Sequence, residues 1–378
     1  MCIAHPTKTL NVRSLNMQKS IVLIIRDGWG INPNPDHNAV ANAHTPNTDL
    51  FLKQYPNTIL DASGTSVGLP EGYQGSSEVG HLNIGAGRIV EQEITKITKN
   101  IQDGTFFKSS IFQKAINDVI DNNSSLHLMG LVQDEGVHAH QDHLFAIMKH
   151  AKEQGVKNLY IHFFADGRDS APKSAINYLC TLKEKIEKYN IGKIATFMGR
   201  YYAMDRGKEW QLTTKAYDAI TKGVGKKIKS EENLEDAIQE VYKTKTPNGK
   251  DMFDEYIPPL IIEGYDGVKD GDSVIHFNYR QDRATQLTMA FVEDDYPGER
   301  WKKFDIVYCG LTRYYDTFPF NILEPMDDSG GMDNLLSQIL SQRGLKQIRI
   351  SETQKYSHVT SFVNGKRTAP FSGEEQIE

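Results

Sequence analysis

Two polar side chains in the first quarter of the sequence have types and positions that could support covalent chemistry. Ser77 follows Gly75 and Ser76 and precedes an apolar-periodic run, so its hydroxyl is predicted at a helix N-terminus, where backbone N–H groups favour an anion. Asp27 ends the apolar run 21–25, at the sheet edge where α/β proteins bind ligands. Together they could share a divalent metal that activates the hydroxyl as a nucleophile. Separately, each also fits a helix cap or a loop aspartate.

A second group of charged residues follows four predicted strands. Because the carboxyl ends of parallel strands meet at one sheet edge, we expect these residues to converge there. Arginines gathered in this way repel one another unless an anion joins them, and guanidinium groups bind phosphate and carboxylate bidentately. A small substrate that carries both groups is the predicted ligand, although any one arginine alone fits a surface position. The residues are His138, Arg168, Asp169, Arg200, Arg206, Arg280 and Arg283.

Apolar runs alternate with helical patterns along the chain, which predicts an α/β fold with buried parallel strands. Strands are predicted at 21–26, 125–132, 157–164, 193–198, 273–279 and 304–309. Helices are predicted at 46–54, 110–121, 140–154, 172–189, 207–221, 231–242 and 332–342, with Pro172 at the first position of its helix. Turn-rich linkers are predicted at 88–95 and at 327–331. The middle of the chain is therefore interpreted as a domain inserted into another.

Composition limits the class of protein. The chain has 378 residues and a formal net charge of −6, which argues against nucleic acid as a partner. Three scattered cysteines, in no metal-binding spacing, indicate a reducing cytoplasm; they are Cys2, Cys180 and Cys309. No apolar run approaches the ~20 residues that span a bilayer. Residues 1–16 are interpreted as a disordered tail or an over-long start, and they faintly resemble a transit peptide.

Two further motifs resemble a metal site and a nucleotide-binding loop, but their spacing and sequence context do not support either function. His138, His140 and His143 resemble a zinc cluster, but no cysteine or acidic residue completes a tetrahedral set. A ligand-contacting His138 with structural neighbours is the favoured interpretation. The pair Gly85-Ala-Gly87 lacks the full dinucleotide fingerprint and follows no strand, so nucleotide binding is not predicted.

Taken together, the motifs resemble those of the cofactor-independent phosphoglycerate mutases. The resemblance runs in the same order from Met17 to the end of the chain. The motifs are Asp27-Gly-Trp-Gly30, Gly75-Ser-Ser through Arg88, Gly136-Val-His138, Asp166-Gly-Arg-Asp169, Gly199-Arg-Tyr-Tyr202, Asp205-Arg206, Arg280 to Arg283, Glu352-Thr-Gln-Lys355-Tyr, and Phe371 to Glu375.

The resemblance implies an alkaline-phosphatase-like parallel-sheet domain, formed by 17–91 and 326–378 and incomplete here, interrupted by an α/β phosphotransferase domain at 92–325. It implies interconversion of 3-phosphoglycerate and 2-phosphoglycerate with two divalent metals, usually manganese, and without 2,3-bisphosphoglycerate. A monomer is expected at full length, with no nucleic-acid or membrane partner.

The same resemblance assigns roles residue by residue. Ser77 would form a phosphoserine beside the metal ligand Asp27, and Lys355 would neutralise the transferring group. The remaining residues would bind substrate: Arg280 and Arg283 the phosphate, Arg200, Arg206 and His138 the glycerate, and Arg168 and Asp169 its hydroxyls, with Asp169 as the proton acceptor.

Departures from the family pattern leave alternatives open. Ser76 stands where the family usually has Asn, and Gln354 where it has Glu, which would change only supporting hydrogen bonds. Family members continue into a stretch that supplies most metal ligands, whereas His358 is the only histidine after Lys355 here. We therefore expect this chain alone to be inactive as a mutase and to bind manganese poorly. A non-catalytic phosphoglycerate-binding fragment and a metal-dependent phosphatase are the alternatives.

Overall fold

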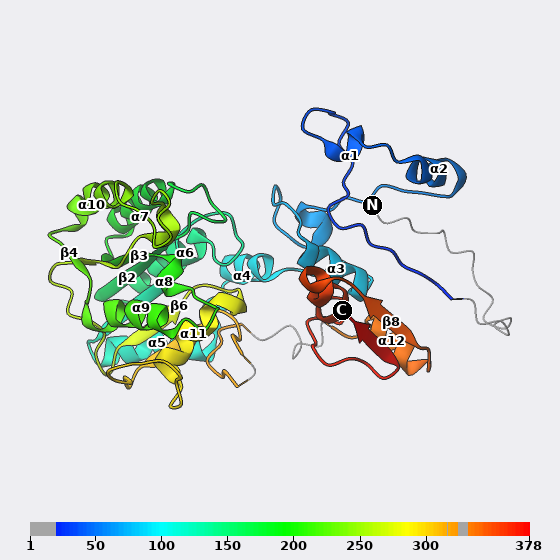
Figure 1. The fold of residues 1–378 in the computed structure, drawn as a ribbon. Helices are drawn as coiled ribbons and strands as arrows, with labels where there is room; N and C mark the ends of the chain where they lie inside the picture. Colours follow the sequence, from blue (N-terminus) through cyan, green and yellow to red (C-terminus); the bar gives the residue numbers. More distant parts are fainter. Residues whose placement is uncertain (1–19, 316, 324–331) are drawn as a thin grey trace. The chain divides into compact units, whose positions relative to one another are not determined.

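The computed structural model describes residues 20–315, 317–323 and 332–378. Its residues divide into two compact units, which we describe separately (Figure 1). Unit 1 comprises Met1–Glu91 and Met332–Glu378, and unit 2 comprises Gln92–Gly331. The predicted tail at 1–16 and the predicted linker at 327–331 lie outside the described residues.

Unit 2 contains a seven-stranded sheet with the order β4-β5-β3-β2-β1-β6-β7. All neighbouring strands run parallel except β5, which is antiparallel to β3, so the sheet is mixed but mostly parallel. This confirms the predicted α/β class. The strands are β1 (Ser125–Leu131), β2 (Asn158–Ala165), β3 (Lys193–Gly199), β4 (Lys226–Ile228), β5 (Leu260–Ile262), β6 (Ser273–His276) and β7 (Val307–Gly310).

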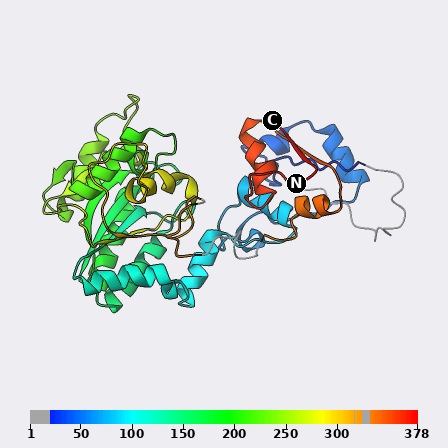
Figure 2. The ribbon, with the colours of Figure 1, turned by 90° about the horizontal axis from the view of Figure 1, so that it is seen from below.

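Helices cover both faces of this sheet (Figure 1). One face carries α5, α6, α7 and α10, where Phe112 of α5 packs against His150 of α6. The opposite face carries α9 and α11, which meet through Tyr217 and Phe291 (Figures 1 and 2). Helix α6 connects β1 to β2, toward one edge of the sheet, and α11 connects β6 to β7, toward the other edge. Because both crossovers are right-handed, the two helices lie on opposite faces. The helices of unit 2 are α4 (Glu93–Gln102), η3 (Phe106–Lys108), α5 (Ser110–Asp121), α6 (Gln141–Glu153), α7 (Ala175–Tyr189), α8 (Arg200–Ala203), α9 (Trp210–Lys222), η4 (Glu231–Asn233), α10 (Leu234–Tyr242), η5 (Asp254–Tyr256) and α11 (Gln281–Val292).

The order of the strands creates a switch point between β1 and β6. From there the chain proceeds outward through β2 and β3 on one side and through β7 on the other. The carboxyl ends of two such neighbouring strands leave a crevice, because the loops that follow them turn to opposite faces. His138 follows β1 and Arg280 follows β6, so both lie at this crevice.

Most of the predicted helix and strand positions in unit 2 are confirmed, but two predicted helix starts are three residues early. The helix predicted from 207 begins at Trp210. The helix predicted from 172 begins at Ala175. The Pro172 carbonyl accepts a hydrogen bond from the Asp254 backbone N–H, 2.9 Å away, and so lies in the loop before α7. The three-residue strands β4 and β5 were not predicted, because they are too short to show periodicity.

Unit 1 has smaller elements. Among the described residues of this unit the sheet consists of two parallel strands, β8 (Gln347–Ile350) and β9 (Glu374–Ile377). The helices are α1 (Ala39–Asn42), α2 (Pro46–Gln54), η2 (Gly64–Val67), α3 (Ser77–Ala86), α12 (Leu336–Gln342), α13 (Thr353–Ser357) and the π-helical turn η6 (His358–Phe362).

The strand predicted at 21–26 is wrong for this structure. No described residue pairs with this segment as a strand, and its side chains are exposed, Ile21 by 93% and Ile24 by 73%. The β-branched composition gives the segment strand propensity, but a strand forms only when neighbouring backbones satisfy its hydrogen bonds. Composition therefore predicted the strand propensity of this segment, but not whether it pairs with another strand.

No helix of the described residues is both long and apolar enough to cross a membrane. Of the two described cysteines, Cys180 is exposed and Cys309 is buried, and neither forms a disulfide.

Candidate functional site

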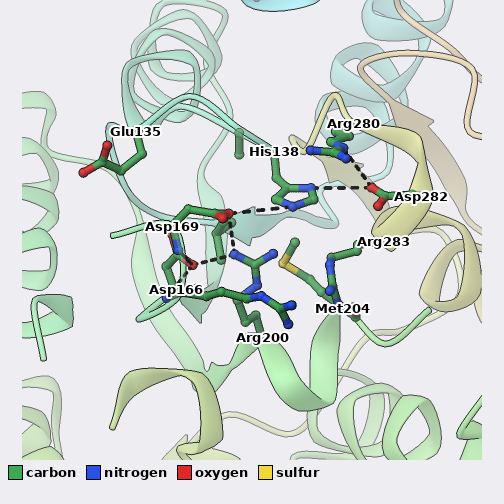
Figure 3. Close-up of polar contacts among 12 residues, drawn as sticks. Glu135, His138, Asp166, Asp169, Arg200, Met204, Arg280, Asp282 and Arg283 are labelled. Carbon is green, nitrogen blue, oxygen red and sulfur yellow. Dashed lines mark hydrogen bonds and ion pairs between the residues drawn. The ribbon is translucent and has the colours of Figure 1, made fainter. Parts of the chain in front are cut away.

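A buried ion pair forms the centre of the site in unit 2 (Figure 3). The Arg200 guanidinium donates to Asp166 Oδ1 at 2.5 Å and to Asp169 Oδ2 at 2.6 Å. The side chains of Arg200 and Asp166 are each only 1% exposed. Burial disfavours a charged arginine, but the two carboxylates outweigh it and raise the pKa of Arg200. The carboxyl ends of β2 and β3 are thereby joined.

Asp166 also shapes the loop that follows β2. Its Oδ1 accepts the backbone N–H groups of Arg168 and Asp169, each at 3.2 Å, and its Oδ2 accepts that of Ser170 at 3.1 Å. One carboxylate therefore fixes three successive backbone groups, as an Asx turn does. In the sequence Asp166 stands out only as part of a motif, and nothing in the motif indicates this structural role.

His138 lies between two carboxylates at the switch point. Its Nε2 is 3.7 Å from Asp169 Oδ2, and its Nδ1 is 3.7 Å from Asp282 Oδ1 (Figure 3). Burial, followed by the positive charges of the surrounding arginines, lowers the pKa of His138 to about 2. The imidazole is therefore neutral at physiological pH and can donate one hydrogen bond and accept another. Its Nδ1 is buried and has no hydrogen-bond partner in the described structure.

Asp282, in the first turn of α11, connects residues from three loops. Its Oδ2 accepts from Arg206 at 2.6 Å, and its Oδ1 is 3.3 Å from Arg280 Nε. Oδ1 is buried, faces the imidazole of His138 and makes no hydrogen bond within the described residues. No role was predicted for Asp282 from the sequence. Its position between two arginines of one motif was the available signal.

Arg283 has a different environment. Its guanidinium donates to the Met204 carbonyl at 3.0 Å, and no ion pair joins it to a carboxylate of the described residues. Burial, with repulsion from Arg200, Arg206 and Arg168, lowers the pKa of Arg283 to about 10. A half-buried guanidinium that is repelled by its neighbours is the expected binding group for an anionic ligand.

Arg168 is placed at the edge of this cluster. Its side chain is half exposed and lies 3.4 Å from Glu255 Oε1, in η5. Gly199 explains why η5 can come so close to the end of β3, since a Cβ there would lie 2.2 Å from the Glu255 carbonyl oxygen. The structure thus brings all seven predicted residues to one sheet edge, and adds Asp166, Asp282 and Glu255.

The neighbouring Asp254 ties η5 to the start of α7. Its Oδ2 accepts the backbone N–H groups of Ser174 and Ala175, both at 2.8 Å, and its Oδ1 accepts the Tyr242 hydroxyl. Burial raises the pKa of Asp254 to about 6, although these hydrogen bonds favour the charged form. A remote carboxylate therefore caps α7, whose own N-cap residue makes no side-chain cap.

This raised pKa predicts a pH dependence of stability. Because the folded protein binds this proton more readily than the unfolded chain, the free energy of unfolding should fall as the pH rises from about 4 through 6. In Asp254→Asn, the amide oxygen can accept both backbone N–H groups while the amide donates to Tyr242. We expect this variant to gain about 2 kcal/mol over the wild type near pH 8 and to match it near pH 4.

Urea denaturation of both proteins across this pH range measures the effect. Asp251→Asn, which removes an exposed carboxylate from the same segment, is the matched control. Parallel profiles for the wild type and Asp254→Asn would contradict the assignment.

Unit 1 contains a compact trio of polar groups. The Ser77 hydroxyl donates to Asp27 Oδ2, and Lys355 Nζ lies 2.7 Å from Ser77 Oγ and 2.6 Å from Asp27 Oδ2. Burial works against the charged carboxylate, but hydrogen bonds from Lys355 and Ser77 outweigh it and lower the pKa of Asp27. The arrangement can accept the proton of Ser77 and stabilise negative charge on its oxygen.

Close helix packing brings these groups together. Ser77 is the first residue of α3, which is capped by Ser76, whose Oγ accepts the Val79 N–H at 3.3 Å. Lys355 belongs to α13, which continues into η6. Gly85 allows the two elements to meet, because a Cβ there would lie 2.0 Å from the Val363 carbonyl oxygen.

The three histidines near the switch point make separate contacts. His140 caps α6 by accepting the Asp142 N–H at 3.1 Å, and the buried His143 Nε2 contacts Thr98 Oγ1 at 3.0 Å. They gather into no metal-binding group in the described part of the chain.

Comparison with known proteins decides the family. The family model described as the N-terminus of BPG-independent PGAM matches residues 97–316. A 2,3-bisphosphoglycerate-independent phosphoglycerate mutase from Acetivibrio thermocellus is 44% identical over 365 residues. The chain belongs to this family. One of its members from Methanosarcina acetivorans is 45% identical over 365 residues.

A solved structure agrees with this assignment. Leishmania mexicana phosphoglycerate mutase, crystallised at low cobalt concentration, matches with a TM-score of 0.77 and 30% identity over 93% of this chain. Each of the two mutases named above matches 95% of this chain, and the chain spans 69% of the length of each. It spans 65% of the length of the solved chain.

Asp27 and Ser77 do not by themselves fit the two divalent metals that the family implies. Carboxylate and hydroxyl oxygens are suitable donors, but each such ion takes several ligands. In the described residues no three His, Cys, Asp or Glu side chains gather around a common point. The Lys355 ammonium also contacts both candidate oxygens. We therefore derive no step through the metals.

Proposed function

We propose that the chain acts in the interconversion of 3-phosphoglycerate and 2-phosphoglycerate through a phosphoserine at Ser77. The observation that carries the proposal is the contact of the Ser77 hydroxyl with both a carboxylate acceptor, Asp27, and an ammonium donor, Lys355. Such a pair can take up the proton of the nucleophile and offset the charge that develops on its oxygen.

In this proposal unit 2 binds the substrate. Arg280 and Arg283 hold the phosphate, and Arg200 and Arg206 orient the glycerate together with the neutral His138. Arg168 and Asp169 contact the glycerate hydroxyls, and Asp169 accepts the hydroxyl proton. The half-buried, repelled guanidinium of Arg283 supports this assignment, because phosphoryl transfer depends mainly on positioning and charge neutralisation.

The reaction balances without a further reactant. Ser77 Oγ forms a bond to phosphorus while the bond from phosphorus to the glycerate oxygen breaks, and that oxygen takes up a proton. The other glycerate hydroxyl then attacks the phosphorus of the phosphoserine and releases its own proton to Asp169, while the bond from phosphorus to Ser77 Oγ breaks and Ser77 Oγ regains its proton from Asp27. Lys355 balances negative charge in both halves. The alkaline-phosphatase-like character of unit 1 and a cytoplasmic location are parts of the same proposal.

The assignment of Arg283 gives a direct test. We expect Arg283→Lys to weaken binding of 3-phosphoglycerate to the 378-residue chain by about 2 kcal/mol, roughly thirtyfold, because a bidentate group becomes a point charge. Titration calorimetry measures the affinity.

Arg300→Lys is the matched control, since Arg300 also donates to backbone carbonyls, those of Ala290 and Asp294. Equal, small effects at both positions would show that the arginine cluster does not bind the substrate.

A further inference from the structure

Asp282 places a negative charge inside the cluster that is proposed to bind an anion. It lies within 3.3 Å of both Arg206 and Arg280, and 3.7 Å from the neutral His138 (Figure 3). A carboxylate in this position takes up guanidinium N–H groups that a phosphate or a carboxylate of the substrate would otherwise use.

The contacts of Asp282 are unequal. Oδ2 accepts a short hydrogen bond from Arg206, whose side chain is about half exposed. Oδ1 faces Arg280 and His138 but is buried without a hydrogen bond in the described structure. A half-satisfied carboxylate is held mainly by the positive charge around it, so a ligand with better geometry can replace it.

The other carboxylates of the cluster differ from Asp282. Asp166 is buried and binds three backbone N–H groups as well as Arg200, so it is part of the scaffold. Asp282 accepts no backbone N–H group within the described residues, and its side chain is 31% exposed. It is thus the carboxylate that can exchange partners without disturbing a loop.

We propose that Asp282 competes with the substrate's anionic groups for Arg206 and Arg280, and so limits how tightly the cluster retains them. This inference rests on the proposed function, because it takes phosphoglycerate as the ligand. Five arginines at one sheet edge would otherwise bind small anions tightly and release product slowly. Asp282 is a positioning residue that acts through the two arginines.

The test is the affinity of the 378-residue chain for 3-phosphoglycerate and for inorganic phosphate, measured by calorimetry, with dissociation rates from stopped flow. Asp282→Asn should bind 3-phosphoglycerate about tenfold tighter and release it correspondingly more slowly. If Asp282 only stabilised the fold, the variant would bind more weakly. Ligand-induced increases in melting temperature should also be larger in the variant than in the wild type.

Asp294→Asn is the matched control. Asp294 follows α11 at its other end, about 18 Å along the helix axis, and pairs with Lys303 on the surface. It removes the same charge, so an equal gain in both variants would overturn the proposal. Asp282→Ser serves as a second variant if the asparagine does not fold, and unchanged or weaker binding in the folded variant would also overturn it.

The two ligands separate this inference from the proposed function. Tighter binding of both ligands in Asp282→Asn, with no preference for 3-phosphoglycerate over phosphate in either protein, would support the competition and reject phosphoglycerate as the substrate. If neither protein binds either anion, both proposals fail.

Discussion

Replacing Ser77 with alanine is expected to abolish phosphoryl transfer while substrate affinity stays within about twofold of the wild type. The variant loses the oxygen that would form the covalent bond, and Asp27 and Lys355 cannot replace it because they are its acceptor and donor. Loss of a nucleophile in a covalent mechanism lowers turnover by about four orders of magnitude or more. The proposed binding groups belong to unit 2, so binding is spared.

The experiment needs a background in which turnover can occur. Conversion of 3-phosphoglycerate is measured by phosphorus NMR in the 378-residue chain and in a chimera. In the chimera these residues replace the matching 69% of the Acetivibrio thermocellus mutase. Mass spectrometry then shows whether Ser77 carries a phosphate.

The neighbouring serine is the control. Ser76→Ala removes the cap on the Val79 N–H and should cost about 1 kcal/mol of stability, but it leaves the nucleophile in place. Turnover by the Ser77→Ala chimera at a rate near that of Ser76→Ala would exclude Ser77 as the nucleophile.

Local patterns were sufficient to predict most of unit 2. Its central strands are buried on both faces, because helices cover both sides of a mostly parallel sheet. The helix predicted at 110–121 has the observed bounds, as does the helix predicted at 46–54 in unit 1. The expectation that charged residues after several strands would meet at one edge follows from strand direction alone, and the positions of His138 and Arg280 at the switch point agree with it.

The sequence did not reveal which partner each charged group would take. Arg200 was predicted to bind substrate, yet its guanidinium donates hydrogen bonds to two carboxylates of this chain. A guanidinium fits a protein carboxylate and a substrate carboxylate equally well, so the residue type cannot distinguish them. Asp254 caps a helix some 80 residues before it in sequence, a relationship that no local spacing could show. The strand predicted at 21–26 was wrong for a similar reason, because strand pairing depends on residues that are distant in the sequence.

The buried pair in unit 2 gives the second large effect. We expect Asp166→Ala to reduce the free energy of unfolding of unit 2 by about 3 to 5 kcal/mol, because it leaves the buried Arg200 with half of its neutralising charge. The substitution also removes the acceptor of three backbone N–H groups in the loop after β2, so binding of 3-phosphoglycerate should be lost as well.

Urea denaturation followed by the fluorescence of Trp210 and Trp301 measures the stability of this unit. Asp251→Ala is the matched control, because its ion pair with Lys245 has a nitrogen–oxygen distance of 2.6 Å, close to the 2.5 Å of the buried pair, but is exposed. Solvent screens that pair, and we expect no measurable change. If both variants lost the same free energy of unfolding, burial would not explain the stabilisation by the Asp166–Arg200 pair. The loop after β2 would then have to be held by other contacts.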